Sequence, residues 1–297
     1  MEINLYSKEL GEIPDEVWKN GEATSLNIVG NGLTSISPKI AQMRSLKVLY
    51  LGSNDLGYLP DVIGELTNLE ELSAVFCKLK AITRKIGNLC NLKKLDFSNN
   101  HLTILPEELG NLWRLEELNI YNYALRELPS SMHLLKNLRI LNLPGNNLSC
   151  LPPRFEELES LDELNLTHNK FTQFPLSVTR LPKLRELSLG SNSITLLPDE
   201  MCNMRGLTHI SLYYNKFSTL PNNIGNMTSL VHLHASDTNL TYLPDSIGNL
   251  ANLEGGWFSH CRITRVPDSL GNCTKLRTLY LQCNQLEKIP ATLYNLT

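Results

Sequence analysis

The sequence predicts an α/β solenoid: a curved horseshoe with a parallel β-sheet on its concave face and short 3₁₀ or helical turns on its convex face. Three observations predict this fold class. A 23-residue pattern recurs along the chain without an insertion or deletion, a leucine leads nearly every copy, and a Leu-Pro pair recurs at one place within it. Fixed periods of this length are typical of repeat architectures, in which each repeat stacks on the next.

The leading leucine, taken as position 1 of the repeat, sets the register of the whole chain. Ala23 opens one earlier repeat, and Ile3 is the fourth residue of a first one. We therefore expect residues 1–297 to form a single domain of about 13 repeats, the last of them truncated. The leading leucines are Leu46, Leu69, Leu92, Leu115, Leu138, Leu161, Leu184, Leu207, Leu230, Leu253 and Leu276.

Positions 3 to 8 of the repeat alternate as a short strand with one buried face does. Leu118 and Ile120 are expected to point inward, and Asn119 outward. One such strand per repeat gives a parallel sheet with a spacing of about 4.8 Å. At position 9 a buried asparagine is expected to bond to backbone groups of its own turn and of the neighbouring repeat. These asparagines are Asn31, Asn54, Asn100, Asn146, Asn169, Asn192, Asn215 and Asn284.

Leucine and proline at positions 14 and 15, as in Leu59-Pro60, end the apolar run. Proline presets φ near −65° and is expected to occupy the first position of a short helical turn. About six residues remain before the next leucine, which favours a 3₁₀ turn over a long α-helix. The pair that follows, as in Ile247-Gly248, predicts an apolar plug and then a flexible exit.

These residues resemble those of leucine-rich-repeat proteins, and specifically the 23-residue class with the signature L-P-x-x-I-G-x-L. That class is seen in Ras-suppressor-like proteins, in plant intracellular Ras-group proteins and in many bacterial repeat proteins. The resemblance covers essentially the whole chain. It implies a protein-binding scaffold and no particular chemistry, because a fold by itself does not define a function.

Composition narrows the classes of partner and compartment. A net charge of −3 with 19% charged residues argues against a nucleic-acid or acidic-lipid binder. The first ten residues already belong to the repeat and lack the features of a signal peptide, and no later stretch is apolar enough to span a membrane. Seven cysteines, scattered over six repeat positions, favour a reducing compartment. We expect a cytoplasmic protein; the alternative is secretion into a host cell by a route without a cleaved signal.

Large side chains gather at outward strand positions in the C-terminal third. The centre of the strand, position 5, is small and polar in the middle of the chain and becomes large and aromatic towards its end. Exposed tyrosine and tryptophan on a rigid sheet are enriched in binding hot spots. We therefore predict one partner-binding patch on the concave face, made of Tyr213, Tyr214, His232, His234, Trp257, His260 and Tyr280.

Two other interpretations of this patch remain open. Trp257 and Tyr280 could pack against each other, or the aromatic residues could cover the apolar end of the stack. The glutamates at position 3, among them Glu186, alternate with nearby lysines as a solvated face does. A smaller N-terminal group is a candidate second contact area: Tyr50, Phe76, Tyr121 and Tyr123.

Core positions also depart from the pattern. Gly255 and Gly256 remove two side chains from the strand that carries Trp257, which predicts a void or a local shift of the backbone. Cys77 and Cys261 replace the asparagine at position 9. Cysteine is an alternative at this position in the family that the chain resembles, so we expect buried structural thiols rather than nucleophiles.

The sequence gives little indication of a metal site or a catalytic site. His209 and His232 share position 3 of adjacent strands, and His234 lies two residues along, which on paper permits a three-histidine zinc site. Only Asp237 offers a supporting carboxylate, and we predict no metal and no cofactor. The chain lacks a G-x-S-x-G elbow, an H-E-x-x-H motif, a Walker-type loop and a C-x-x-C pair. We predict that it is not an enzyme.

The sequence therefore predicts a rigid, non-enzymatic protein-binding scaffold that uses its concave face, mainly the C-terminal third. The alternatives are a purely architectural array, a bacterial secreted effector, and the repeat domain of a larger signalling protein, acting on a host or on Ras-type pathways. Leu293 and Leu296 lack a polar cap, and solenoids usually need one for solubility. We therefore expect self-association through this end, a covering partner, or further residues after Thr297.

Overall fold

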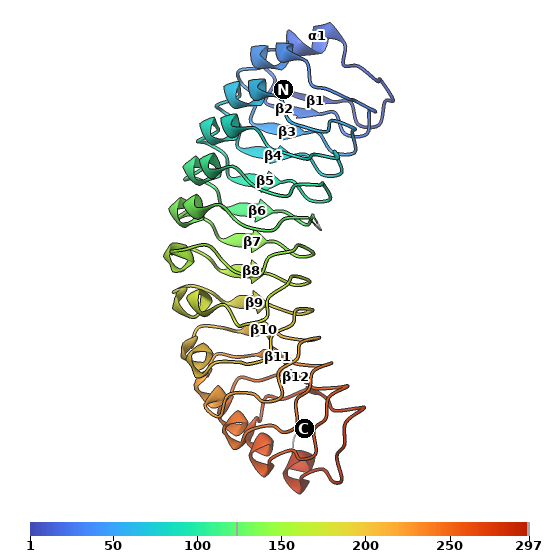
Figure 1. The fold of residues 1–297 in the computed structure, drawn as a ribbon. Coiled ribbons are helices and arrows are strands. Elements are labelled where there is room, and N and C mark those ends of the chain that lie inside the picture. Colours follow the sequence, from blue (N-terminus) through green and yellow to red (C-terminus); the bar gives the residue numbers. More distant parts are fainter. Residues whose placement is uncertain (123, 296–297) are drawn as a thin grey trace. The chain divides into compact units, whose positions relative to one another are not determined.

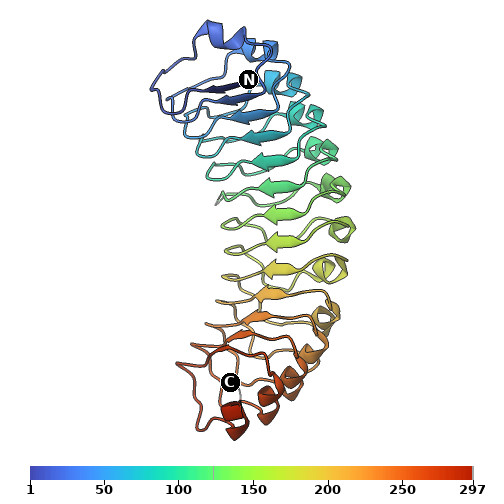
Figure 2. The ribbon, with the colours of Figure 1, turned by 180° about the vertical axis from the view of Figure 1, so that it is seen from behind.

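The computed structural model describes residues 1–122 and 124–295, so Tyr123, Leu296 and Thr297 lie outside the described residues. The chain divides into two compact units, Met1–Leu161 (unit 1) and Asp162–Thr297 (unit 2). Within each unit a three-residue strand, a turn and a short helix recur in that order, and the helices line one side of the sheet (Figures 1 and 2). The predicted fold class, a leucine-rich-repeat type of solenoid with a parallel sheet and short 3₁₀ turns, is confirmed within each unit.

In unit 1, each strand pairs in parallel with the next, and partner residues are 23 positions apart. The strands are β1 (Glu2–Asn4), β2 (Ser25–Asn27), β3 (Val48–Tyr50), β4 (Glu71–Ser73), β5 (Lys94–Asp96), β6 (Glu117–Asn119) and β7 (Ile140–Asn142). The helices are α1 (Asp15–Trp18) and the 3₁₀ helices η1 (Pro38–Gln42), η2 (Asp61–Glu65), η3 (Arg84–Asn88), η4 (Glu107–Asn111), η5 (Ser130–Leu134) and η6 (Phe155–Glu157).

In unit 2 the same parallel pairing and the same 23-residue offset recur. The strands are β8 (Glu163–Asn165), β9 (Glu186–Ser188), β10 (His209–Ser211), β11 (His232–His234), β12 (Gly255–Trp257) and β13 (Thr278–Tyr280). The 3₁₀ helices are η7 (Leu176–Arg180), η8 (Asp199–Asn203), η9 (Ile224–Asn226), η10 (Asp245–Asn249), η11 (Asp268–Asn272) and η12 (Ala291–Asn295).

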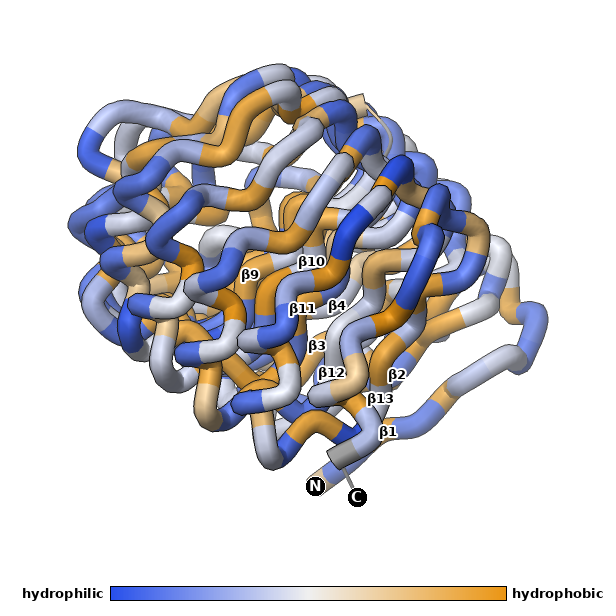
Figure 3. Tube along the Cα trace, turned by 90° about the horizontal axis from the view of Figure 1, so that it is seen from below, coloured by the Kyte–Doolittle hydropathy of each residue, from blue (hydrophilic) through white to orange (hydrophobic). Residues whose placement is uncertain are grey.

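The strands bury one face and leave the other accessible, as their alternation predicts. In β3 the central Leu49 is fully buried, whereas Val48 and Tyr50 on either side of it are half-buried. Figure 3 shows hydrophobic and hydrophilic segments alternating along the tube. The first and last residues of each strand, at positions 3 and 5 of the repeat, therefore form an accessible surface. We call this surface the strand face.

Buried asparagines at position 9 join consecutive repeats, which confirms their predicted role. The Asn54 amide nitrogen donates to the carbonyls of Ile28 and Leu51 at 3.0 and 2.6 Å. Its oxygen accepts from the backbone N–H groups of Asn31 and Leu33 at 3.1 and 2.9 Å. One side chain thus satisfies backbone groups in its own repeat and in the preceding one, where water cannot reach them.

Cysteine takes over part of this role where asparagine is missing. The buried Cys77 thiol donates to the Leu51 carbonyl at 3.2 Å, and the buried Cys261 thiol donates to that of Ala235 at 3.4 Å. Burial raises the pKa of Cys77 to about 11, so this thiol stays protonated at neutral pH. The prediction of buried structural thiols is confirmed.

Proline stands one residue earlier in the turn than the sequence suggested. Pro60 precedes η2 in an extended conformation, with φ −71° and ψ 155°, rather than occupying the first helical position. The same arrangement holds for Pro106 before η4 and Pro244 before η10, whereas Pro38 is the first residue of η1. Proline therefore fixes the extended residue that precedes the helix. No backbone hydrogen bond is lost there, because the helix does not need an N–H donor at that position.

The prediction that glycine at position 19 is a flexible exit is wrong. A Cβ atom built on Gly64 would lie 2.6 Å from the Lys85 carbonyl oxygen, and one on Gly248 would lie 2.3 Å from that of Ser269. Neither glycine has a positive φ. Glycine is needed here because the backbone of the next 3₁₀ helix packs directly on it.

None of the helices within the described ranges, 1–122 and 124–295, is long and apolar enough to cross a membrane. In the last repeat of unit 2, Leu279, Leu281 and Leu286 are only half-buried, although the same positions are buried in earlier repeats. Self-association through this end stays a prediction.

Candidate partner-binding site

Six of the seven residues of the predicted patch lie together in unit 2: His232, His234, Trp257 and Tyr280 on the strand face, and Tyr213 and Tyr214 directly after β10. Parallel pairing places His234 of β11 beside Trp257 of β12, and Trp257 beside Tyr280 of β13. Ring centroids are 5.9 Å apart in the first pair and 6.5 Å in the second. Both distances fall within the range of favourable aromatic contacts.

Further rings extend these contacts across the strands. Tyr213 stacks on His234, with centroids 4.9 Å apart and planes inclined by 27°, and Tyr214 meets Tyr213 edge-on at 5.8 Å. His232 lies edge-on to Trp257 at 5.3 Å and to His209 at 4.6 Å. We call this set the aromatic cluster: His209, Tyr213, Tyr214, His232, His234, Trp257 and Tyr280.

Glycines beneath the rings allow them to lie on the sheet. A Cβ atom on Gly255 would lie 2.3 Å from the Trp257 indole, and one on Gly190 would lie 2.4 Å from the Tyr213 ring. A Cβ atom on Gly256 would meet the Phe258 ring at 2.8 Å on the buried side. The expected void or backbone shift at these glycines is therefore wrong, because neighbouring rings fill the space that a side chain would take.

The cluster combines mutual packing with exposure. Its rings contact one another, as the packing interpretation of Trp257 and Tyr280 expected. Yet Tyr214 is 57% exposed and Tyr280 is 44% exposed, while Trp257 and Tyr213 are half-buried. The rings therefore hold one another in place and still present accessible apolar area.

His260 is the predicted residue that the structure does not join to the cluster. It is exposed, with a φ of +53°, and its backbone N–H donates to the Gln282 carbonyl at 2.9 Å. Among the ring contacts of the described residues, none involves the His260 imidazole. It lies in the turn after β12, at the same repeat position as Tyr214, whose ring does contact the cluster.

A hollow opens on the strand face beside Trp257. It has a volume of about 220 Å³. Six of its lining residues were not in the predicted patch, namely Glu186, Leu187, Ser188, His209, Ile210 and Ser211. Two of them, Ser188 and Ser211, are small side chains at position 5. Their size beside large neighbours was the one sequence signal that could have indicated a depression.

Two imidazoles beside this hollow, His232 and His234, favour their neutral form. Burial lowers the pKa of His232 below its usual value of 6.5, and the neighbouring His209 lowers it further. Burial also lowers the pKa of His234. His209 Nδ1 lies 2.9 Å from the Thr208 hydroxyl and 3.9 Å from the Glu186 carboxylate. At neutral pH the His232 and His234 rings are therefore uncharged.

The same histidines are those that on paper permitted a three-histidine zinc site. The His209 and His232 rings contact each other edge-on, at an interplanar angle of 81°. Across residues 1–122 and 124–295, no three histidine, cysteine or acidic side chains converge in a way that could hold a metal ion.

The N-terminal group of aromatic residues in unit 1 has other partners. The Tyr50 hydroxyl donates to the Glu71 carboxylate at 2.8 Å, and burial together with this carboxylate raises the pKa of Tyr50. Phe76 is exposed, and Tyr121 lies over Gly145. Tyr123 lies outside the described residues, so a second contact area stays a prediction.

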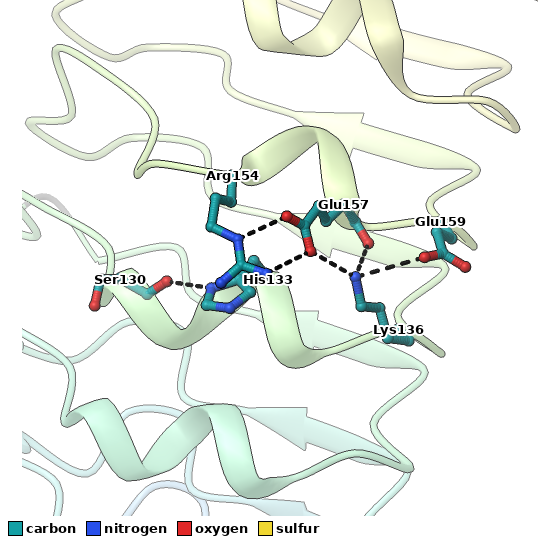
Figure 4. Close-up of polar contacts among 6 residues, drawn as sticks. All are labelled: Ser130, His133, Lys136, Arg154, Glu157 and Glu159. Carbon is teal, nitrogen blue, oxygen red and sulfur yellow. Dashed lines mark hydrogen bonds and ion pairs between the residues drawn. The ribbon is translucent and has the colours of Figure 1, made fainter.

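A charged cluster on the helix side of unit 1 is held by ion pairs (Figure 4). Arg154 makes a two-point contact with Glu157, at 2.6 and 3.0 Å. Lys136 lies 3.0 Å from Glu157 and 3.5 Å from Glu159. Hydrogen bonds from Arg154 and then Lys136 lower the pKa of Glu157 to about 2. These charges neutralise one another, and Lys136 ties the segment after η5 to η6.

Comparisons with known proteins agree with this architecture. Residues 76–188 and 175–296 match the family model described as leucine-rich repeat region, and residues 22–79 match the model described as leucine rich repeat. No curated protein matches the chain. The family models thus cover most of the chain.

Solved structures show the same relationship. A leucine-rich-repeat protein of Leptospira interrogans is 32% identical to this chain, with 99% of this chain and 87% of that protein covered and a TM-score of 0.66. An internalin (InlF) of Listeria monocytogenes is 22% identical, with 100% and 84% covered and a TM-score of 0.88, which shows the fold alone. The plant peptide hormone receptor RGFR1, in complex with RGF2, is 26% identical, with 96% and 55% covered and a TM-score of 0.66. With its repeats, its sheet and these matches taken together, the chain belongs to the leucine-rich-repeat family.

Proposed function

We propose that this protein is a non-enzymatic scaffold that binds a protein or peptide on the strand face of unit 2. The observation that carries the proposal is the aromatic cluster, whose rings touch one another across four adjacent strands, β10 to β13. Tyrosine and tryptophan supply large contact area at a small loss of conformational entropy. His260 is included as a residue at the margin of the same surface.

Pre-organisation favours this surface as a binding site. The rings rest on a sheet whose register is repeated from strand to strand, and Gly190 and Gly255 let two of them lie close to the backbone. Little side-chain entropy is lost when a partner binds to rings that already hold one another. A peptide hormone receptor among the similar structures also supports a protein or peptide partner.

Two narrower proposals concern the repeat class and the compartment of this protein. We propose that the chain belongs to the 23-residue class of leucine-rich repeats, on the strength of its repeat length and its L-P-x-x-I-G-x-L signature. We propose a reducing compartment, such as the cytoplasm, because seven cysteines are scattered over six repeat positions. Alkylation of the protein from its native source should then find seven free thiols, and recovery of disulfide-linked peptides would contradict this location.

The test of the binding proposal is the double substitution Trp257→Ala with Tyr280→Ala. Wild type and variant are used as baits in native lysate, and captured proteins are quantified by mass spectrometry. We expect a specific partner to be lost from the variant, because two of the central rings of the contact are gone. That partner is then purified and its dissociation constant measured, with an expected increase of more than about 30-fold, equivalent to about 2 kcal/mol.

A matched control separates the patch from general loss of apolar surface. Leu196→Ala with Tyr242→Ala removes two exposed side chains of unit 2 that lie outside the aromatic cluster. This control should keep its partner, and both variants should keep the wild-type circular dichroism spectrum. Equal binding by wild type and the Trp257/Tyr280 variant would show that the patch is wrongly assigned.

A further inference from the structure

We propose that the hollow beside Trp257 receives an arginine side chain of the partner. This inference rests on the proposed function and names the chemistry of its central contact. The hollow lies between Glu186 of β9 and Trp257 of β12. Three strand spacings separate these residues, about 14 Å between their backbones, which leaves room for a long side chain to lie across the intervening strands.

Charge is the first argument for a cationic occupant. Glu186 is the one acidic residue that lines the hollow, and no lysine or arginine is among the described residues that line it. Its carboxylate side chain is 54% exposed. The lowered pKa values of His232 and His234 keep both rings uncharged at neutral pH. An anionic occupant would be repelled by Glu186, whereas a cation would be attracted to it.

Unused hydrogen-bonding capacity on the floor is the second argument. Ser188 and Ser211 are half-buried at position 5 of adjacent strands. Among the residues that the structure describes, neither hydroxyl makes a hydrogen bond within the chain. A purely apolar occupant would strip water from both hydroxyls and from the carboxylate without replacing the lost hydrogen bonds.

The shape of the lining selects arginine among the cations. Its planar guanidinium carries five N–H donors, enough for the Glu186 carboxylate and for the two serine hydroxyls at once. The apolar stem of arginine can lie along the hollow towards Trp257, which lines the other end. The lysine ammonium is a compact, strongly hydrated charge and cannot bond the carboxylate and both hydroxyls in one plane.

The inference is tested with N-acetyl-L-arginine amide as the probe and N-acetyl-L-citrulline amide as its uncharged counterpart of the same shape. Binding to the full chain is followed by NMR at the indole N–H of Trp257, assigned against a Trp257→Phe variant. We expect the arginine probe to bind with a dissociation constant of about 1 mM, a value typical of a single weak contact. Citrulline should bind at least about five-fold more weakly, because it cannot pair with Glu186.

Glu186→Gln is the matching substitution in the protein. It keeps the size of the side chain and removes the charge, and we expect it to weaken binding of the arginine probe about three- to five-fold. Glu117→Gln is the control, because Glu117 occupies the same repeat position in unit 1 and does not line the hollow. It should leave binding of the probe unchanged.

Several results would overturn the inference. They are equal binding of arginine and citrulline, an unchanged affinity in Glu186→Gln, and tighter binding of N-acetyl-L-glutamate amide. A partner that is lost with Trp257→Ala and Tyr280→Ala but is fully retained by Glu186→Gln would remove the arginine contact and leave the proposed function intact. A partner that both variants retain would remove the proposed function itself.

Discussion

The side chains of each repeat fall into two groups, which point inward or outward and have different roles. Inward residues such as Leu49 and Asn54 fill the core and satisfy the backbone, and the repeat pattern dictates them. Outward residues such as Ser211 and Trp257 lie on the strand face, and the repeat pattern does not dictate them. The distinction explains why the asparagine ladder could be predicted from the sequence and the hollow could not.

At the residue scale, Asn54→Leu should lower the free energy of unfolding by about 3 to 5 kcal/mol. The substitution leaves the buried N–H groups of Asn31 and Leu33 without a partner, at a cost of about 1 to 3 kcal/mol for each group not reached by water. The Ile28 and Leu51 carbonyls each lose one of two donors and keep their bonds to Asn31 and Cys77. Urea denaturation followed by circular dichroism measures the change.

Asn68→Leu is the control for this substitution. Asn68 is exposed and makes one hydrogen bond, from its amide nitrogen to the Arg44 carbonyl at 2.9 Å. Its replacement should lower stability by less than about 1 kcal/mol, because water can take over that bond. Similar losses in both variants would show that the buried amide is not what joins the repeats.

At the scale of the element, the spacing between 3₁₀ helices is set by contact and not by flexibility. Gly64 and Gly248 allow the next helix to pack on bare backbone. The role of these glycines could not be predicted from the sequence. A glycine can serve a backbone conformation that other residues avoid, or a place where a Cβ atom would clash, and the sequence does not distinguish the two. The neighbouring helix, which lies 23 residues further on, decides between the two.

Gly248→Ala should therefore lower the free energy of unfolding by about 1 to 3 kcal/mol, the usual cost of overpacking. Its new methyl group would lie 2.3 Å from the Ser269 carbonyl oxygen, so η10 and η11 would have to separate. Thermal or urea unfolding of the purified variant gives the value.

Gly206→Ala provides the comparison, since a Cβ atom there would meet nothing within 4 Å and φ is not positive. It should be neutral or slightly stabilising, because alanine restricts the unfolded chain. If Gly248→Ala were as stable as Gly206→Ala, close packing of the helices could not be the reason for glycine at position 19.

At the scale of the whole molecule, contacts run from each repeat to its neighbours in sequence. Partner residues in every strand pair of unit 1 and of unit 2 are 23 positions apart. Stability is then close to a sum of repeat and interface contributions. The length of the repeat matters more to folding than the identity of any one repeat.

Deletion of residues 69–91 should therefore leave a folded protein. The cut removes one whole repeat, including the cysteine-bearing turn at Cys77, and brings Asn54 into register with Asn100. The urea m-value should fall roughly in proportion to the 23 residues removed from 297.

Deletion of residues 69–90 is the control. It leaves one extra residue, which shifts the strand pattern so that buried and exposed faces are exchanged, and it should unfold or aggregate. Equal stability of the two deletions would contradict a fold maintained by register.

The class of fold, the parallel register, the buried asparagines and the strand positions with aromatic residues are all predictable from the sequence. All of these follow from periodicity, because one repeat length specifies which side chains share a face. Three features could be seen only in the folded chain. Rings fill the space above Gly255, Glu186 and two serines line a hollow, and the His260 ring makes no contact with the cluster. These features depend on the conformations of side chains from several repeats, which the spacing of residues along the chain does not specify.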